Sequence, residues 1–233
     1  MPTLSQIGTI TGLLQGINDG DTTVQQLKAL GDIGLGTYNR IDGEMVILDG
    51  ACYRIKKNGH AEIADPNQCT PFAVISPYQP TLSFTIDQVE NSTDLNQKLD
   101  AQLKTKNIFY MIRIDAKIDW IKLRSEGCQS APYQPLAEAL SSTQSIYELT
   151  KTKGTLITTR CPSYSAGITI PGFHHHFINH DKTIGGHVFD VKCKHALVKV
   201  TLLRRFNMQL LNNQAFDTAN LNIDSQVLLK KTE

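Results

Sequence analysis

IRIDAKIDWIKLR, residues 112–124, alternates apolar and charged side chains with the two-residue period of a β-strand. Every second residue from Ile112 to Trp120 is apolar, and the residues between them are charged. The alternation shifts by one position where Trp120 and Ile121 adjoin, and it then continues to Arg124. Such a shift predicts a β-bulge, which often re-aims side chains beside a functional site. The chain is therefore expected to contain a long strand with a bulge.

Further strands and helices are interspersed along the rest of the chain. Strands are expected at 44–50, 51–55, 60–63, 155–160, 167–178, 187–193 and 196–203. Helices are expected at 4–16, 22–31, 92–107 and 132–149, and a short helix or an ordered tail at 221–233. GDIGLG at 31–36 has neither dinucleotide-binding nor phosphate-loop spacing, so turns are expected there. Without a regular βαβ alternation, the pattern predicts an α+β fold of mixed β-sheets with a few flanking helices.

The composition is that of an ordinary globular protein, with 40% hydrophobic residues among 233. Lysine plus arginine number 23 against 22 for aspartate plus glutamate, so no basic excess points to nucleic acid or to an anionic membrane surface. The first residues form no secretion signal, and no apolar run approaches the roughly 18 residues that span a bilayer. Five scattered cysteines without a CxxC pair indicate reduced thiols. We therefore expect a cytoplasmic protein without nucleic-acid or membrane partners.

GFHHHF, residues 172–177, places three histidines between two phenylalanines. Side chains of a strand alternate between its faces, so His174 and His176 are expected on one face, and His175 on the other with the phenylalanines. A His-x-His pair on a strand can chelate one ion, because two neutral imidazoles can converge on it at about 2.0–2.1 Å. The run therefore predicts two metal ligands and one bystander.

His187 is the candidate for a third ligand. It opens the next expected strand, eleven residues after His176, and a hairpin of that length would bring the two side by side. Three histidines leave coordination positions open for water or substrate, which is typical of a catalytic metal site. The prediction is a metal site on a β-hairpin, although from spacing alone the run could also be a solvated surface feature. His60 and His195 have no partner pattern and are expected to be structural.

Several blocks of the sequence, in this order, resemble the α-acetolactate decarboxylase family along nearly the whole chain. They are GDIGLGTYNRIDGEMVILDG (31–50), TPFAVI (70–75), GTLITTRCPSY (154–164), GITIPGFHHHF (167–177) and GGHVFDV (185–191). The family pattern is a Pro-Gly-aromatic-His-x-His-Phe strand followed by a Gly-Gly-His strand. Each block is short, but their order and spacing together make the resemblance specific. It implies a metal-dependent enzyme that converts 2-acetolactate to acetoin and carbon dioxide.

The resemblance also implies a set of site residues around a divalent metal, usually zinc. The metal ligands would be His174, His176 and His187. The catalytic residues would be Glu44 in IDGEM, Arg124 in IKLR and the last residue, Glu233. Thr37 in GTYN would line the site. Arg160, before CPSY, is a second candidate for an arginine that faces the substrate.

Two positions depart from the family pattern. His175 stands where the middle residue of His-x-His is often leucine, so it offers an alternative ligand if the strand changes register. SEGCQSAPY, which follows Arg124, differs from the usual Met/Val-Pro-Lys-Gln type of run.

The expected chemistry is decarboxylation of a 2-hydroxy-3-keto acid through a metal-stabilised enediolate. The metal would act as a Lewis acid, the glutamates would transfer protons, and the arginine would orient a carboxylate. Two alternatives stay open: another three-histidine metal enzyme acting on a related keto acid, or a non-catalytic protein of the same fold that binds a metal or small molecule. The resemblance further implies a homodimer. Each chain is expected to be a single catalytic unit (1–233), or two sheet-centred subdomains (about 1–105 and 106–233) that share one site.

Overall fold

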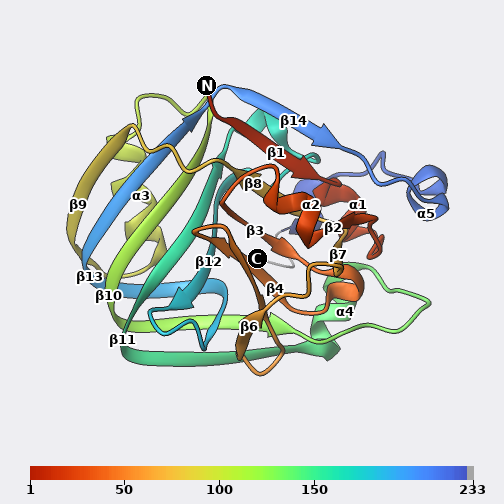
Figure 1. The fold of residues 1–233 in the computed structure, drawn as a ribbon, viewed down its shortest axis with the longest axis horizontal. Helices are drawn as coiled ribbons and strands as arrows, with labels where there is room; N and C mark the ends of the chain where they lie inside the picture. Colours follow the sequence, from red (N-terminus) through yellow and green to blue (C-terminus); the bar gives the residue numbers. More distant parts are fainter. Residues whose placement is uncertain (230–233) are drawn as a thin grey trace.

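The computed structural model describes residues 1–229, which form two large β-sheets with short helices beside them (Figure 1). The two sheets pack face to face. Leu35 and Val46 of the first sheet share one apolar core with Met111, Ile157 and Ile178 of the second. This layered arrangement confirms the predicted fold of mixed sheets with a few flanking helices.

The first sheet has seven strands in the order β14-β1-β8-β3-β4-β5-β6. Its pairs are antiparallel except for β1 and β14, which run parallel. The strands are β1 (Thr3–Ile7), β3 (Ile33–Thr37), β4 (Glu44–Leu48), β5 (Ala51–Ile55), β6 (Ala61–Ile63), β8 (Ala73–Ser76) and β14 (Arg205–Gln209). A small separate pair is formed by β2 (Thr22–Thr23) and β7 (Cys69–Thr70).

The second sheet consists of long antiparallel strands that curve back on themselves. The strands are β9 (Leu82–Val89), β10 (Phe109–Glu126), β11 (Gln144–Cys161), β12 (Gly172–Asn179) and β13 (Gly185–Leu203). β10 pairs with both β11 and β13. β12 runs along β11 and also meets the start of β13, so these four strands form a closed circuit.

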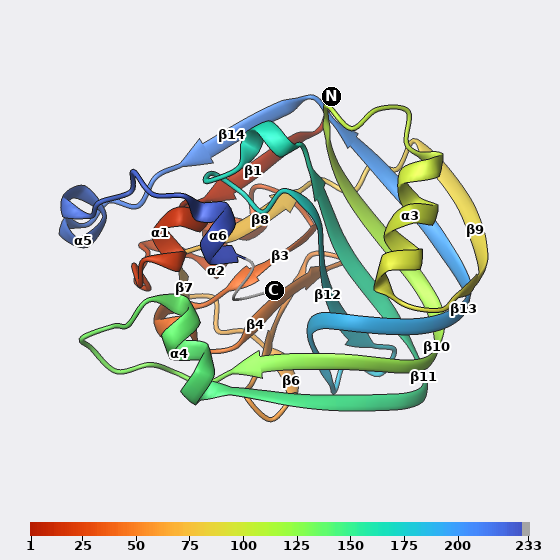
Figure 2. The ribbon, with the colours of Figure 1, turned by 180° about the vertical axis from the view of Figure 1, so that it is seen from behind.

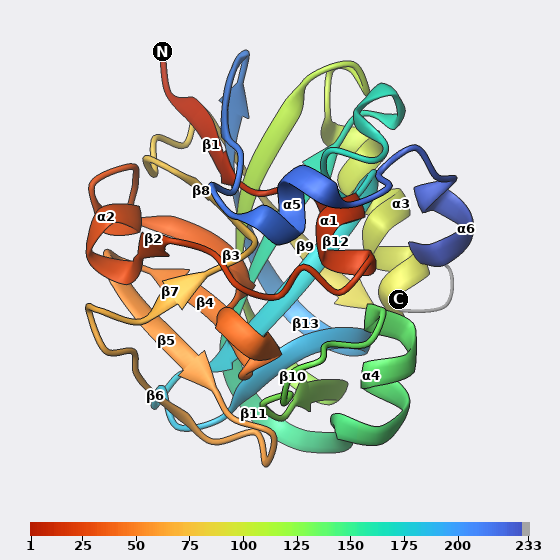
Figure 3. The ribbon, with the colours of Figure 1, turned by 90° about the vertical axis from the view of Figure 1, so that its right-hand side faces the viewer.

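The helices cover the outer faces and one end of the sheets. They are α1 (Ile10–Leu14), α2 (Val24–Lys28), α3 (Ser92–Gln102), α4 (Leu136–Thr143), α5 (Gln214–Thr218) and α6 (Ser225–Leu229), with 3₁₀ turns at Asn39–Ile41 and Ser163–Ser165. α3 buries Leu95 and Leu99 against the second sheet, while α2 buries Val24 and Leu27 against the first. α1 packs against both α4 and α6, so three helices distant in sequence lie together (Figure 2, Figure 3).

The predicted long strand and its bulge are both confirmed. β10 includes the whole of 112–124, and its pairing with β13 shifts register between Ile118 and Trp120. Ile112 and Ile114, on the face towards α3, are fully buried. Two further irregularities lie at Asp115/Lys117 and at Lys122/Leu123. The last of these immediately precedes Arg124.

The turns expected at GDIGLG are wrong, because residues 33–37 form the buried strand β3. The glycines allow β8 to approach closely. A Cβ at Gly34 would lie 2.3 Å from the carbonyl oxygen of Val74, and one at Gly36 would lie 2.4 Å from that of Phe72. Glycine at these positions reflects a contact with a distant strand rather than a local change of direction.

Three other boundaries differ from the expected ones. The helix expected at 4–16 is strand β1 followed by α1, with Gly8 at a φ of +67° between them. The helix expected at 132–149 ends at Thr143, where β11 begins directly. The strands expected at 187–193 and 196–203 are one strand, β13, interrupted by His195 at a φ of +51°. Each of these boundaries depends on pairing between strands, which the periodicity of the local sequence does not show.

The two sheets exchange strands across the subdomain boundary expected near residue 105. β14 comes from the second half of the chain and joins the first sheet, whereas β9 comes from the first half and joins the second. The chain thus interlocks its two halves. Among residues 1–229, no helix is long and apolar enough to cross a membrane.

Gly34→Ala should lower the free energy of unfolding by about 2 kcal/mol or more, because the added Cβ would overlap backbone atoms of β8. Urea denaturation measures this change. Gly127→Ala is the matched control, since the nearest atom to its Cβ belongs to the flexible Lys57 side chain, at 3.1 Å. Equal losses for the two variants would contradict the close approach of β8 to β3.

Candidate functional site

Strand pairing brings the three histidines together. His174 and His176 lie two residues apart on β12, and His187 on β13 is the cross-strand partner of His176. On β10, Arg124 is the cross-strand partner of His187. Directly opposed side chains on one face of a sheet are close neighbours. The predicted hairpin that places His187 beside the His-x-His pair is confirmed.

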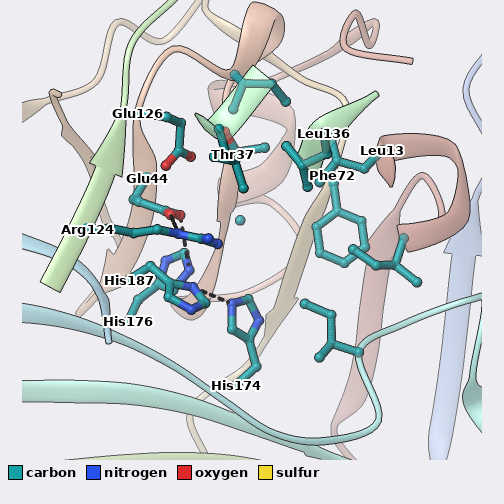
Figure 4. Close-up of a pocket in the computed structure, with 15 residues that line it drawn as sticks. Leu13, Thr37, Glu44, Phe72, Arg124, Glu126, Leu136, His174, His176 and His187 are labelled. Carbon is teal, nitrogen blue, oxygen red and sulfur yellow. Dashed lines mark hydrogen bonds and ion pairs between the residues drawn. The ribbon is translucent and has the colours of Figure 1, made fainter. Parts of the chain in front are cut away.

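The three imidazoles are buried and converge on one point (Figure 4). One nitrogen atom from each lies within 4.8 Å of the others. Nε2 of His174 is 3.1 Å from Nδ1 of His187, and the rings of His174 and His176 are 4.8 Å apart between centroids. Ligands of a tetrahedral zinc site are separated by about 3.3 Å, so this cluster can hold a metal ion with little movement.

The backbone of β4 orients His176 for metal binding. Nδ1 of His176 lies 2.8 Å from the carbonyl oxygen of Met45, which can only accept a hydrogen bond. Nδ1 therefore carries the proton, and Nε2 keeps its lone pair. Nε2 lies 3.1 Å from Oε2 of Glu44. A lone pair and a carboxylate oxygen repel each other unless a proton or a cation lies between them, so a metal ion fits the donor set found here.

His187 is held in the neutral form that metals require. Burial lowers its pKa well below the ordinary value, and the positive charge of Arg124 and the neighbouring histidines lower it further. A neutral imidazole has a lone pair available for coordination. His187 is therefore ready to bind a metal at neutral pH without first losing a proton.

Glu44 and Arg124 lie beside the histidines as a buried pair. Nε of Arg124 is 3.7 Å from Oε1 of Glu44, and the guanidinium lies over the ring of Phe189 at 5.3 Å. Ser125 fixes this end of β10 against the first sheet, since its hydroxyl donates to the carbonyl of Ile55 and accepts from the backbone N–H of Glu44. The two charged groups are thus held by the packing of one sheet on the other.

The site opens into a pocket with a polar side and an apolar side (Figure 4). Thr37 lines the pocket, and its hydroxyl donates to the carbonyl oxygen of Gly43. The apolar side is formed by Ile10, Leu13, Phe72, Leu136, Leu140 and Ile170, several of which come from α1 and α4. Such a pocket suits a small molecule that carries both charged oxygens and alkyl groups.

His175 points to the opposite face of β12, as predicted. Its Nδ1 is 2.7 Å from the hydroxyl of Thr158, and its Nε2 is 2.8 Å from Oδ1 of Asn96 on α3. The ring stacks on Phe173 with centroids 5.9 Å apart. This network holds β12 against α3, while His174 and His176 lie on the opposite face of the strand.

The remaining two predicted site residues lie elsewhere. Arg160 is directed away from the pocket, because its guanidinium donates to Asp100 of α3 and to the carbonyl oxygen of Lys106. It is not among the residues that line the pocket. Glu233 lies outside the described residues.

Sequence reasoning missed Glu126, a buried carboxyl group that lines the same pocket. It is the last residue of β10, two positions after Arg124. Strand alternation places residues two apart on one face, so this spacing was a signal that could have identified it.

Known proteins resemble this chain in both sequence and fold. The family model for alpha-acetolactate decarboxylase matches residues 4–223. The chain belongs to this family.

Individual relatives match over most of their length. An alpha-acetolactate decarboxylase of Methanosarcina mazei is 36% identical over 99% of this chain and 80% of its own. One of Methylococcus capsulatus is 37% identical over 93% of this chain and 83% of its own. The crystal structure of alpha-acetolactate decarboxylase from Bacillus subtilis strain 168 superimposes with a TM-score of 0.96, at 32% identity over 99% of both chains. The fold described above is therefore the fold of this family.

The purified protein should carry about one divalent metal ion per chain, and His174→Ala or His187→Ala should remove nearly all of it. Two remaining imidazoles bind a metal much more weakly than three. Elemental analysis by plasma mass spectrometry after dialysis measures the content.

His175→Ala is the matched control for this experiment. It removes a neighbouring histidine from the other face, so the metal should be retained while the melting temperature falls with the loss of the contacts to Thr158 and Asn96. Loss of metal in His175→Ala alone would contradict the assignment of faces on β12.

Proposed function

We propose that this protein decarboxylates 2-acetolactate to acetoin and carbon dioxide with a divalent metal held by His174, His176 and His187. The observation that carries the proposal is the convergence of these imidazoles with Glu44 and Arg124 in one buried pocket. Membership of the alpha-acetolactate decarboxylase family supports the same reaction.

Zinc is the proposed metal, because it accepts three imidazoles in a tetrahedral site and leaves a fourth position open. When bound, the cation supplies a Lewis acid that withdraws electron density from substrate oxygen atoms as negative charge develops on them. The hydrogen bond from His176 to the carbonyl oxygen of Met45 supports the orientation of that ligand.

Arg124 is proposed to orient the substrate. Its planar guanidinium can hold a carboxylate through two parallel hydrogen bonds, and stacking on Phe189 limits its motion. In the reaction, the bond between the carboxylate carbon and C2 breaks, and its electron pair is delocalised towards the adjacent ketone as an enediolate. The arginine contributes by holding the carboxylate in the orientation that cleavage of this bond requires.

Glu44 is the proposed group for proton transfer. Acetoin forms only when the carbon that lost carbon dioxide gains one proton, so a carboxyl group beside the reacting carbon is needed. Glu44 is 4% exposed and lies between His176 and Arg124. Thr37, the cross-strand partner of Glu44, is proposed to contact the substrate from the same side. Glu233 is proposed as a second catalytic carboxylate.

The apolar side of the pocket suits the rest of this substrate. 2-Acetolactate carries two methyl groups, and side chains such as Leu13, Phe72 and Leu136 can pack against them. Displacing water from this side also strengthens the polar interactions on the other. We further propose that the protein works as a homodimer in the cytoplasm, since the family resemblance suggests a dimer and the scattered cysteines suggest reduced thiols.

The purified protein should convert 2-acetolactate to acetoin with release of one equivalent of carbon dioxide. A chelator should abolish turnover because the imidazoles alone supply no Lewis acid, and added zinc should restore it. A colorimetric acetoin assay with parallel oxygen monitoring measures both. Absence of acetoin from metal-loaded protein would contradict the proposal, and oxygen consumption would indicate a different three-histidine enzyme.

Glu44→Gln should lower kcat by about 100-fold or more, because the amide cannot transfer a proton. Metal content should stay near that of the unaltered protein, since the three histidines remain. Glu62→Gln is the control: Glu62 pairs with Arg54 and Lys56 away from the pocket, and its removal should leave kcat unchanged. A Glu44→Gln variant with ordinary turnover would exclude Glu44 from the chemistry.

A further inference from the structure

Glu126 is a second carboxyl group within the candidate site. It is 3% exposed and ends β10 on the same face as Arg124. Its side chain lines the pocket together with Glu44 (Figure 4). Burying an ionisable group is costly unless it is paired, so its presence here calls for a reason beyond packing.

The contacts of Glu126 connect it to the reactive groups. Its carboxyl group lies beside that of Glu44 in the pocket (Figure 4). A hydrogen bond between the two carboxyl groups and the positive charge of Arg124 both act to lower the pKa of Glu126. Two carboxyl groups can share a hydrogen bond only when one of them carries a proton. Glu44 is therefore held from two directions, by Glu126 on one side and by His176 and Arg124 on the other.

Tyr147 of β11 is a further titratable group that interacts with both carboxyls, and its hydroxyl donates to the carbonyl oxygen of Gly185. Burial, followed by the charges of Glu44 and Glu126, raises the pKa of Tyr147, so it stays neutral. Burial likewise raises the pKa of Glu126, while Arg124 and the bond to Glu44 oppose that rise.

We propose that Glu126 is a positioning residue, whose hydrogen bond to Glu44 fixes the Glu44 carboxyl group between His176 and Arg124. This inference rests on the proposed function, in which Glu44 transfers the proton. It does not depend on which of the two carboxyls carries the shared proton, because the bond orients Glu44 in either case. Glu126 lies on the side of Glu44 away from the three histidines (Figure 4), so we expect its role to be separate from metal binding.

Two substitutions distinguish positioning from other roles. Glu126→Gln keeps a group that can donate to or accept from Glu44, so kcat should stay within about 3-fold of the unaltered protein. Glu126→Leu has no polar group, so kcat should fall by about 10- to 100-fold while KM changes little. Its melting temperature should not fall, because leucine removes the cost of burying a carboxyl group. Metal content should be the same in all three proteins.

Gln144→Leu is the matched control for Glu126→Leu. Gln144 is the cross-strand partner of Glu126 at the same end of the sheet, but it does not line the pocket. Its replacement should leave kcat unchanged. A comparable loss of rate in Gln144→Leu would show that any disturbance of this sheet end slows the enzyme, and would overturn the assignment to Glu126.

Crystal structures of the two Glu126 variants test the inference without turnover. Glu44 should keep its position in Glu126→Gln and move away from His176 in Glu126→Leu. An unmoved Glu44 with full activity in Glu126→Leu overturns the proposal. A Glu126→Gln variant as slow as Glu126→Leu also overturns it, because the carboxyl group itself would then be required. If the unaltered protein makes no acetoin, the proposed function fails, and the position of Glu44 still decides the inference.

Discussion

The contact of His176 with β4 is the interaction on which the site depends. One imidazole from the second sheet meets two consecutive residues of the first: Nδ1 is 2.8 Å from the carbonyl oxygen of Met45, and Nε2 is 3.1 Å from the carboxylate of Glu44. Neither sheet contains a complete site. The apolar core between them, which includes Val46 and Ile178, therefore supplies the free energy that brings the metal ligands and the acidic group together.

This arrangement concentrates polar groups where their burial is costly. Three imidazoles, two carboxyls and a guanidinium lie in one pocket, and each must be paired or bound to a cation to offset the loss of hydration. The closed circuit of β10 to β13 makes the cluster rigid, since His176, His187 and Arg124 occupy directly opposed positions on neighbouring strands. Proteins commonly exchange stability for such a preorganised site.

The sequence predicted the features that depend on local alternation. The long strand, its bulge and the opposite faces of His174 and His175 follow from the two-residue period, and the hairpin length correctly placed His187. Features that depend on distant neighbours were missed. Residues 33–37 form a strand because β8 packs against their glycines, and no local pattern contains that contact. Glu126 was overlooked because its partner, Glu44, lies in the other sheet, and because SEGCQSAPY departs from the family pattern at this point.

X-ray absorption at the zinc edge of the metal-loaded protein tests the central claim most directly. We predict three imidazole ligands with nitrogen at about 2.0–2.1 Å, together with oxygen donors in the remaining coordination positions. His187→Gln should lose nearly all of the zinc on dialysis, so its zinc-edge signal should largely disappear. Sulfur scatterers at about 2.3 Å, or fewer than three imidazoles in the unaltered protein, would contradict this claim.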